Sequence, residues 1–460
     1  MHDVLSLSGT QQARLIRERA ISSRELVEAH LARIGEINPK LNAAIEILAE
    51  PALAAARDVD SGKVMGPLAG VPFSIKDSIE VAGTVCSAGT VGYRRREVSD
   101  KDATLVARLR GAGAIPLART NLPDLLFAFE SDNLIFGRTN NPYSVQRTSG
   151  GSSGGESALI AACGSPFGLG SDAAGSVRLP AHYCGITSIK PTSGRLARSG
   201  HVPPAGGWIE TLWQIGPMAR RIEDLWTMMP ILLGTDGSDC TVIPMPFERR
   251  PGTLAGLRVA YFTDNGTLAA EPETAATVQA AARALSDVAR VVEERRPPRI
   301  EESYPLEMEM LGSDGGDGLR NFLKDIGSRQ THPLLEGWLS KLEPCRTDLA
   351  GFAKFWDRLD RFRRDLYRFL NDFDVLVSPV SFSPAVPHGT SIADDVFPGY
   401  SYTMTHNLTG WPAAVVRCGQ SSEGLPIGVQ VAAAPWREDV ALTVAEFLES
   451  ACGGWQPAGL

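Results

Sequence analysis

Two serines and one lysine in this chain have neighbours that suit nucleophilic catalysis. Ser152 belongs to a serine pair flanked by glycine pairs in residues 150–155, Ser176 follows two alanines and a glycine, and Lys76 ends a short apolar run. A serine hydroxyl is a weak nucleophile at neutral pH unless a base lies beside it. Lysine is such a base only when uncharged, so burial or nearby positive charge must lower its pKa from about 10.4. These residues predict a serine that attacks a carbonyl carbon, with lysine as the base.

The residues around Lys76 and Ser176 favour these roles. The stretch 71–75 is mostly apolar and supplies burial, while Asp77 need not oppose it because adjacent side chains of a strand face opposite sides. Small residues before Ser176 let the backbone approach a substrate carbonyl, and successive N–H groups there are placed to bind an oxyanion. Those N–H groups belong to Ala173, Ala174, Gly175 and Ser176. For each site alone, an exposed lysine or an ordinary turn is the plain alternative.

The glycine-rich segment 150–155 has rival interpretations. A flexible linker does not fit, because the following residues 156–162 favour a helix, and a phosphate loop would end in Gly-Lys-Ser/Thr. Residues 150–154 do match the G-x-S-x-G nucleophile elbow, although 141–148 make a poor strand before it. A Ser/His esterase with Ser152 as nucleophile therefore stays open, since five histidines are available as its base: His182, His201, His332, His388 and His406.

The elements that must position these residues alternate between strands and helices, which indicates an α/β protein. A capping box at Ser22 and Glu25 predicts the start of a helix. Further helices are expected over most of 43–56, at 104–111 and 156–163, from Pro272 onward and around 440–448. The expected strands are 114–118, 256–262, 374–378 and 428–432, with a short apolar run at 70–75. Residues 295–405 show weaker periodicity, so we expect either an insertion or lid over the site or ordinary surface helices and loops.

Composition limits the function classes. The chain has 460 residues and a net charge of -8, which disfavours a nucleic-acid partner because such proteins present a basic face. Its seven cysteines include no C-x-x-C pair, so neither a disulfide framework nor a zinc site is predicted. We find no signal peptide and no apolar run of about 18 residues, and so expect a cytoplasmic protein without a transmembrane segment.

Several segments together resemble the amidase signature family, and in particular its fatty acid amide hydrolase-like bacterial branch. The resemblance is strong over 65–225, and one position departs from it, since Ala174 stands where the family usually has glycine. It implies one amidase domain over 1–460 with its signature core at 65–225, built on a large mixed, twisted β-sheet with helices on both faces. The matching segments are 70–77, 150–155, 168–180, 184–186, 190–192, 407–412 and 424–428.

The resemblance also implies roles for individual residues. Ser176 matches the nucleophile, Ser152 a bridging serine that follows a cis peptide bond, and Lys76 the base. Ser153 and Arg178 match supporting positions that hold the loop by hydrogen bonds. The reaction so implied is hydrolysis of a carboxamide through an acyl-enzyme, with no metal and no cofactor.

The substrate is predicted from one segment. Residues 121–129 resemble a pocket-lining segment of the fatty acid amide hydrolase-like members, so Leu126, Phe127 and Phe129 would line an acyl or aryl pocket, with ordinary core packing as the alternative. We expect a small, uncharged, hydrophobic or aryl amide, with esters or carbamates also cleaved, and a monomer or homodimer. Two other interpretations stay open: the catalytic subunit of a glutamine-dependent tRNA amidotransferase, and a non-catalytic binding protein on the same scaffold.

Overall fold

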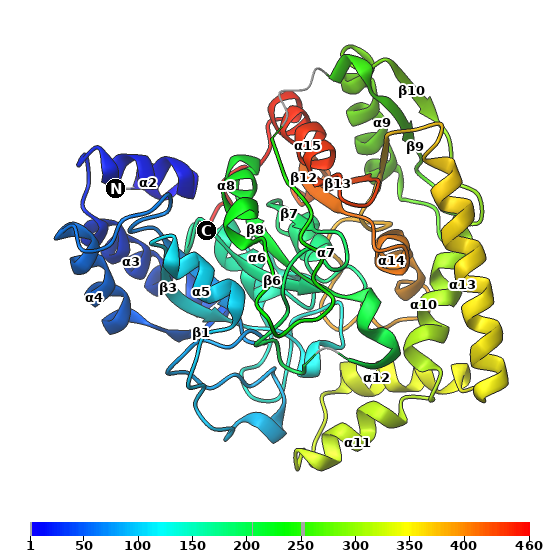
Figure 1. Ribbon diagram of the computed structural model, residues 1–460, viewed down its shortest axis with the longest axis horizontal. Helices are drawn as coiled ribbons and strands as arrows, with labels where there is room; N and C mark the ends of the chain where they lie inside the picture. The colour runs from blue at the N-terminus through cyan, green and yellow to red at the C-terminus, as the bar shows by residue number, and fades with distance from the viewer. Residues whose placement is uncertain (1, 205, 250–253) are drawn as a thin grey trace.

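One mixed β-sheet runs through the molecule (Figure 1). The computed structural model describes residues 2–204, 206–249 and 254–460. The strands of this sheet are β1 (Ala44–Ile47), β2 (Pro72–Lys76), β3 (Ile115–Thr120), β6 (Phe167–Asp172), β7 (Thr187–Lys190), β8 (Gln214–Ala219), β9 (Arg258–Tyr261), β10 (Val291–Glu294), β11 (Val375–Pro379), β12 (Ala413–Gln420) and β13 (Pro426–Ala433). A separate hairpin pairs β4 (Asn140–Asn141) with β5 (Ser144–Thr148).

The strand order mixes parallel and antiparallel pairs. Within the described residues the eleven strands follow the order β1-β3-β2-β6-β8-β7-β12-β13-β11-β9-β10. β2 is parallel to both β3 and β6, and β9 is parallel to both β10 and β11. In the part of this order that runs from β6 to β11, each strand is antiparallel to its neighbours within that part. The α/β class and the large mixed sheet are therefore confirmed.

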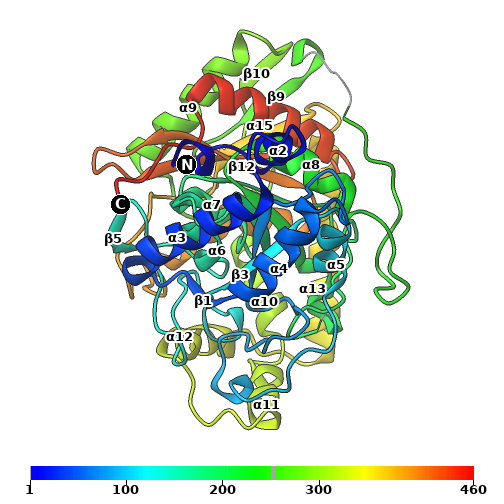
Figure 2. The same cartoon turned by 90° about the vertical axis from the view of Figure 1, so that its left-hand side faces the viewer.

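Helices cover both faces of the sheet (Figures 1 and 2). Each face of the sheet has its own hydrophobic cluster, as strand β12 shows. Ala414 and Val416 pack in one cluster and Val415 packs in the other, because successive side chains of a strand point to opposite faces. The α-helices are α1 (His2–Leu5), α2 (Gly9–Arg17), α3 (Ser23–Leu41), α4 (Ala49–Asp60), α5 (Thr104–Gly111), α6 (Gly154–Ala161), α7 (Arg178–Tyr183), α8 (Ile222–Leu232), α9 (Pro272–Ser286), α10 (Ser303–Gly312), α11 (Asp317–Asp325), α12 (Pro333–Leu342), α13 (Leu349–Phe369), α14 (Ser401–Leu408) and α15 (Glu438–Cys452).

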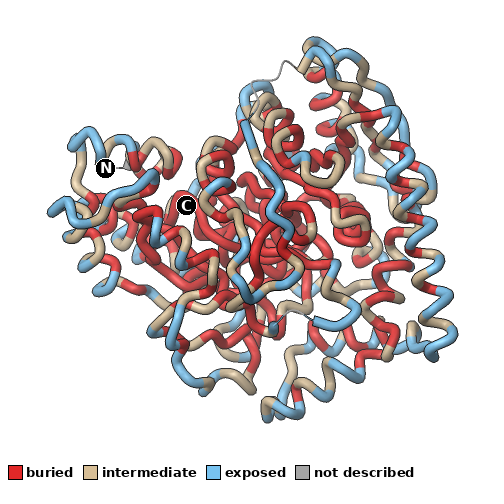
Figure 3. The backbone as a smooth tube through the Cα atoms, viewed as in Figure 1, coloured by how far each residue is buried: buried red, intermediate tan, exposed pale blue. Residues whose placement is uncertain are grey.

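The two clusters bury different helices. The first joins the sheet to α5, α8, α9 and α15, and the second joins it to α3, α4, α6 and α7. Figure 3 shows buried residues along the sheet and the inner helices, with exposed stretches at the periphery. Among the described residues, no helix is long and apolar enough to cross a lipid bilayer.

Most predicted elements are confirmed and two are wrong. The capping box at Ser22 and Glu25 starts α3, and α5 has the predicted bounds. Residues 44–47 form β1 and not a helix, because they pair antiparallel with β3 at the edge of the sheet. Residues 144–148 are a strand after all, stabilised by the hairpin with β4 and not by the main sheet.

Residues 295–405 are largely helical. They hold α10 to α13, which lie at one side and at the foot of the molecule in Figure 1. They also hold β11, which lies between β13 and β9 inside the main sheet. This stretch is therefore joined to the sheet as well as lying beside it.

Candidate active site

Two parallel strands bring Lys76 to the centre of the molecule. In the pairing of β2 with β6, Ser74 is opposite Gly168 and Ile75 is opposite Leu169, so both strands end at the same edge of the sheet. Phe73 and Ile75 pack into the cluster on one face of the sheet. Because side chains alternate, Ser74 and Lys76 face the other side, where α6 begins. Strand β2 thus aims the lysine at the glycine-rich segment that precedes α6.

Lys76 contacts Ser152 directly. Its Nζ lies 2.7 Å from Ser152 Oγ, within hydrogen-bond distance, and the peptide bond between Gly151 and Ser152 is cis, as the resemblance implies. Glycine is needed at 151, because a Cβ there would lie 2.4 Å from the carbonyl oxygen of Ala128. The backbone N–H of Ser153 donates to the carbonyl oxygen of Ser176 at 3.1 Å, which ties this turn to the loop that holds the second serine.

Ser152 and Ser176 line the same cavity. Ser152 is 1% exposed and Ser176 8% exposed, so Ser176 is the serine more open to a bound molecule. In the described part of the chain no hydrogen bond joins the two hydroxyls. Catalytic hydrogen bonds are often long without substrate and tighten in the complex. The structure thus brings all three predicted residues to one place, with Lys76 and Ser152 already in contact.

The loop from Ala173 to Ser176 holds the four backbone N–H groups that the sequence analysis expects to bind an oxyanion. Gly175 differs from the expectation, because its N–H donates to Asp172 Oδ1 at 2.8 Å. Among the described residues, the N–H groups of Ala173, Ala174 and Ser176 have no acceptor within the protein. Three of the four predicted donors therefore remain free at the turn. Glycine is required at 175, which has φ +123° and whose Cβ would lie 2.3 Å from Thr403 Oγ1.

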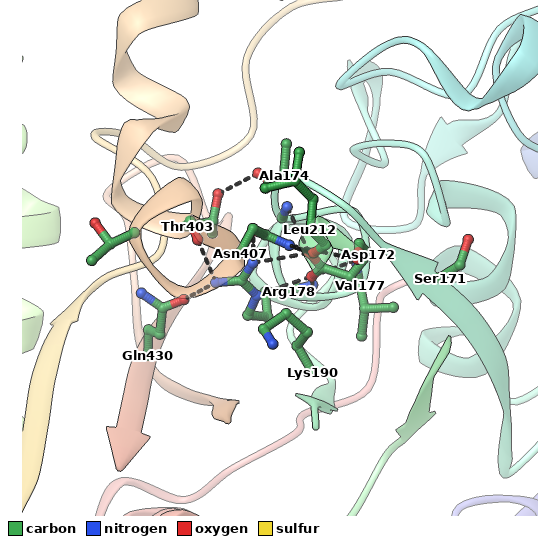
Figure 4. A network of polar contacts seen from close by, with 12 residues as sticks. Ser171, Asp172, Ala174, Val177, Arg178, Lys190, Leu212, Thr403, Asn407 and Gln430 are labelled. Atoms are coloured by element: carbon green, nitrogen blue, oxygen red, sulfur yellow. Dashed lines mark hydrogen bonds and ion pairs between the residues drawn. The ribbon is translucent and has the colours of Figure 1, made fainter. Parts of the chain in front are cut away.

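Arg178 and Asp172 form a buried ion pair behind this loop (Figure 4). Arg178 donates through Nε to Asp172 Oδ2 and through Nη2 to Asp172 Oδ1, both at 2.9 Å. Its other bonds reach the carbonyl oxygen of Thr403 and the side chains of Gln430 and Asn407. Burial raises the pKa of Asp172, but the charge of Arg178 and the hydrogen bonds from Arg178 and Asn407 outweigh it and leave that pKa below its usual value. The carboxylate therefore stays charged and holds the loop.

Arg178 was predicted from the sequence as a residue that holds the loop, but its partners Asp172, Asn407 and Gln430 were not. Asp172 directly follows Ser171 in the motif around the nucleophile candidate, and Asn407 starts one of the matching C-terminal segments. A charged residue inside a glycine-rich, otherwise small-residue motif is a signal that could have found Asp172. No local signal marks Gln430, which reaches the guanidinium from strand β13.

The surroundings of Lys76 favour its uncharged form. Burial lowers its pKa to about 7, although Asp172 and Glu156 act in the opposite direction. Burial also raises the pKa of Glu156 to about 8, against hydrogen bonds from the hydroxyls of Ser74 and Thr120. A protonated Glu156 adds little negative charge near the lysine at neutral pH. Asp77 accepts from Arg119 Nε at 2.9 Å, so its charge is paired elsewhere.

The cavity beside the two serines is mainly apolar. Leu126, Phe127 and Phe129 all line this cavity, and Phe129 also packs against Tyr400 with a ring-centroid distance of 4.1 Å. Phe129 thus lines the cavity and also packs in a hydrophobic cluster. The sequence reasoning missed the other large apolar lining residues: Leu125, Ile209, Leu212, Trp213, Leu311 and Trp338.

The histidines do not support the nucleophile elbow. His182 accepts from the backbone N–H of Gly428 and contacts the carbonyl oxygen of Ser383, and His388 contacts that of Val145. Among the histidine side chains that the structure describes, none forms a hydrogen bond with Ser152 or Ser176. In the part of the chain that the structure describes, no group of three or more His, Cys, Asp or Glu side chains is arranged to bind a metal ion. Lysine is the base candidate that the geometry offers to Ser152.

Comparisons with known proteins extend over nearly the whole chain. A family model described as Amidase matches residues 25–442. Fatty-acid amide hydrolase 2 of Homo sapiens is 30% identical over 491 residues, which cover 98% of this chain and 90% of that protein. A glutamyl-tRNA(Gln) amidotransferase subunit of Salinispora arenicola is 31% identical over 500 residues, with 100% of both chains covered. The structure of 6-aminohexanoate cyclic dimer hydrolase complexed with substrate has a TM-score of 0.87 and 29% identity, covering 99% of each chain.

Proposed function

Since this chain belongs to the amidase family and is an amide hydrolase, we propose that it acts through Ser176 as nucleophile, Ser152 as bridging serine and Lys76 as base. One observation carries the proposal: a buried lysine lies 2.7 Å from Ser152 at the wall of a cavity that Ser176 also lines. A serine nucleophile needs a base that accepts its proton. In the proposed arrangement Lys76 is that base, and it acts on Ser176 through Ser152.

The proposed reaction has two halves. Uncharged Lys76 takes the proton of Ser152, Ser152 takes the proton of Ser176, and Ser176 Oγ forms a bond to the amide carbon. The proton on Lys76 then returns through Ser152 to the leaving nitrogen as the C–N bond breaks, which leaves an acyl ester on Ser176. Water attacks this ester with the same base, and the released serine regains its proton.

The tetrahedral intermediate carries a negative oxygen that needs donors. We assign this role to the free N–H groups of Ala173, Ala174 and Ser176, with Gly175 serving instead to fix the turn through Asp172. Loss of one such donor typically costs about 3 kcal/mol of transition-state stabilisation. The ion pair of Asp172 with Arg178 supports the loop that aligns them.

The cavity lining favours an uncharged, hydrophobic or aryl amide. Phe127, Phe129, Trp213 and Trp338 give it an aromatic wall, and the only carboxylate among its described lining residues, Asp172, is already paired with Arg178. Esters and carbamates with similar groups pass through a comparable oxyanion and fit the same chemistry. Free glutamine fits poorly, because its ammonium and carboxylate groups would lose water without finding countercharges. The amidotransferase interpretation is therefore the weaker one.

The helices of 295–405 support a covering role for this region. Leu311 on α10 and Trp338 on α12 line the cavity, and Trp338 packs edge-on against Phe127 with ring centroids 5.9 Å apart. Within a single amidase domain spanning 1–460 and centred on 65–225, we assign α10 and α12 to one wall of the substrate pocket. We also propose a cytoplasmic monomer or homodimer that acts on small molecules and not on nucleic acid, in keeping with its net charge of -8.

A series of acyl anilides of increasing chain length tests the substrate class. We expect kcat/KM to rise about fourfold per added methylene until the pocket is full, because each buried CH2 contributes about 0.8 kcal/mol. Trp338→Ala, which removes part of the wall, should make this rise shallower while a short acetanilide is affected less. Steady-state kinetics on both proteins measures the slopes. Faster hydrolysis of glutamine than of any anilide in the series would instead favour the amidotransferase interpretation.

The pH dependence should report the ionisation of the base. Only uncharged Lys76 accepts a proton, and its pKa is about 7, so kcat/KM should rise through neutral pH and level off in the alkaline range. The groups that face Lys76 are Asp172, Glu156 and His201. Initial rates with a neutral anilide, whose own ionisation does not change, check this. A profile that is flat, or that falls as pH rises through this range, would exclude an uncharged lysine base.

A further inference from the structure

His201 closes a chain of hydrogen bonds that leads to Lys76. His201 Nδ1 lies 2.9 Å from the carbonyl oxygen of Pro203, and His201 Nε2 lies 3.0 Å from Ser171 Oγ. On its other side, Ser171 Oγ lies 3.1 Å from Lys76 Nζ. His201 also lines the cavity that holds Ser152 and Ser176. The reaction proposed above makes no use of this histidine.

The partners of His201 determine its tautomer and the direction of the chain. A carbonyl oxygen only accepts, so the proton of the uncharged imidazole must lie on Nδ1 and point at Pro203. Nε2 is then an acceptor and takes the hydroxyl proton of Ser171. Because the proton of Ser171 is committed to His201, its oxygen can only accept from Lys76.

These directions decide how an uncharged Lys76 is oriented. A neutral amine has two hydrogens and one lone pair. Its hydrogens find two acceptors on Ser171, Oγ at 3.1 Å and the carbonyl oxygen at 3.4 Å. The lone pair is left for the hydroxyl of Ser152, which is the nearest of the three partners at 2.7 Å. Without His201, the hydroxyl of Ser171 would be free to rotate and donate to the lone pair in competition with Ser152.

We propose that His201 is a positioning residue that acts through Ser171 to hold the lone pair of Lys76 toward Ser152. The inference rests on the proposed function, since it assigns an orienting partner to that base. His201 does not itself reach Ser152 or Ser176, and both its ring nitrogens are already engaged. It is therefore not a second base.

The setting of His201 keeps the ring uncharged. Burial lowers its pKa to about 3; the hydrogen bond with the carbonyl oxygen of Pro203 acts in the opposite direction, and the charges of Lys76 and Arg198 act in the same direction as burial. The ring packs against Trp213, with ring centroids 4.4 Å apart and the ring planes tilted by 44°. The backbone on either side is held by other bonds, since the N–H of Val202 donates to the carbonyl oxygen of Ser78 at 2.7 Å and the carbonyl oxygen of Gly200 accepts from the N–H of Glu80 at 2.9 Å. A change of side chain at 201 should leave this backbone in place.

The rate of labelling of Ser176 by a fluorophosphonate measures what the proposal concerns, namely the activation of the nucleophile without any step of product release. His201→Phe keeps a flat ring against Trp213 and removes both nitrogens. At alkaline pH, where Lys76 is uncharged, we expect labelling to slow by about 10- to 100-fold, because small errors in alignment cost that much. His201→Gln, whose amide has one donor and one acceptor, should recover part of the rate.

Introducing His201→Phe into a Ser171→Ala variant distinguishes a positioning role of His201 from a general effect on the pocket. His201 acts only through Ser171 Oγ, so Ser171→Ala should slow labelling, and adding His201→Phe to Ser171→Ala should slow it no further. His388→Phe is the matched control, since that histidine contacts the carbonyl oxygen of Val145 outside the cavity and should leave the rate unchanged. Thermal unfolding of each variant checks that the fold is kept. If His201→Phe does not fold, the single variants Ser171→Ala and His201→Gln are used in its place.

The outcomes distinguish this inference from the function on which it rests. If the wild-type protein is labelled at Ser176 but His201→Phe is labelled equally fast, the positioning role is wrong and the proposed nucleophile stands. Multiplied effects in the double variant would also overturn it, because they would mean that His201 acts independently of Ser171. If the wild-type protein is labelled elsewhere or not at all, the assignment of Ser176 itself fails.

Discussion

Ser176→Ala is expected to abolish amide turnover, with kcat lowered by about 10⁶-fold, as for removal of the nucleophile in other serine hydrolases. The variant keeps every backbone group of the loop, including the carbonyl oxygen that accepts from Ser153. Only the attacking oxygen is lost, so no acyl-enzyme can form. Anilide hydrolysis measures the loss, and intact-protein mass spectrometry after fluorophosphonate treatment shows whether the adduct is gone.

Substrate binding should survive this change. The apolar wall that includes Phe129 and Trp338 is untouched, so Ser176→Ala should still bind a hydrophobic amide with an affinity close to that of the wild-type protein. Ser193→Ala is a suitable control, because the Ser193 hydroxyl bonds to the carbonyl oxygen of Thr211 outside the cavity and its loss should leave turnover unchanged. Retained turnover in Ser176→Ala, together with an adduct on Ser152, would favour the nucleophile elbow that the sequence left open.

Lys76→Met is expected to lower kcat/KM by about 10³- to 10⁴-fold, which is the upper range for loss of a general base. Methionine has nearly the length of lysine and fills the same buried space but accepts no proton. The rise of activity through neutral pH should disappear with it. Steady-state kinetics across the pH range measures both effects, and wild-type activity in the variant would rule out the base.

The Lys76→Met variant should be more stable than the wild-type protein, although it is less active. Burial lowers the pKa of Lys76 to about 7, below the value near 10.4 of an unfolded lysine, so folding disfavours the charged form. The unfolded chain then binds more protons between these two values, and the free energy of unfolding due to this residue rises with pH there. Lys76→Met removes a cost that is largest below pH 7, so the variant should unfold at a higher temperature than the wild type at neutral or lower pH. A loss of activity with a lower unfolding temperature would indicate a structural role instead.

Short-range patterns predicted much of the fold and of the site. The capping box at Ser22 and Glu25 and the helix at 104–111 depend on residues within a few positions, and both were predicted correctly. The strand at 44–47 was not, because its small and apolar residues suit a helix equally well and only pairing with β3 decides the matter. Likewise, 144–148 is a strand because a hairpin partner lies beside it.

The groups available for chemistry follow from residue type and order: a lysine after an apolar run, a serine pair between glycines, and Ser176 after small residues. The same motifs identify the family, because they occur together and in order. These are properties of residue type and spacing, and they do not depend on what lies next to them in space.

The chemical behaviour of those groups depends on contacts that form when the chain folds. Lys76 has a lowered pKa because strand β2 is buried. Its partner Ser171, and the His201 ring that contacts Ser171, come from segments far along the chain. The N–H of Gly175 is taken by Asp172, and the wall of the pocket includes Trp338 from a helix that local periodicity did not define. Burial, hydrogen-bond direction and pocket shape arise from contacts between distant residues, and for that reason spacing along the chain does not contain them.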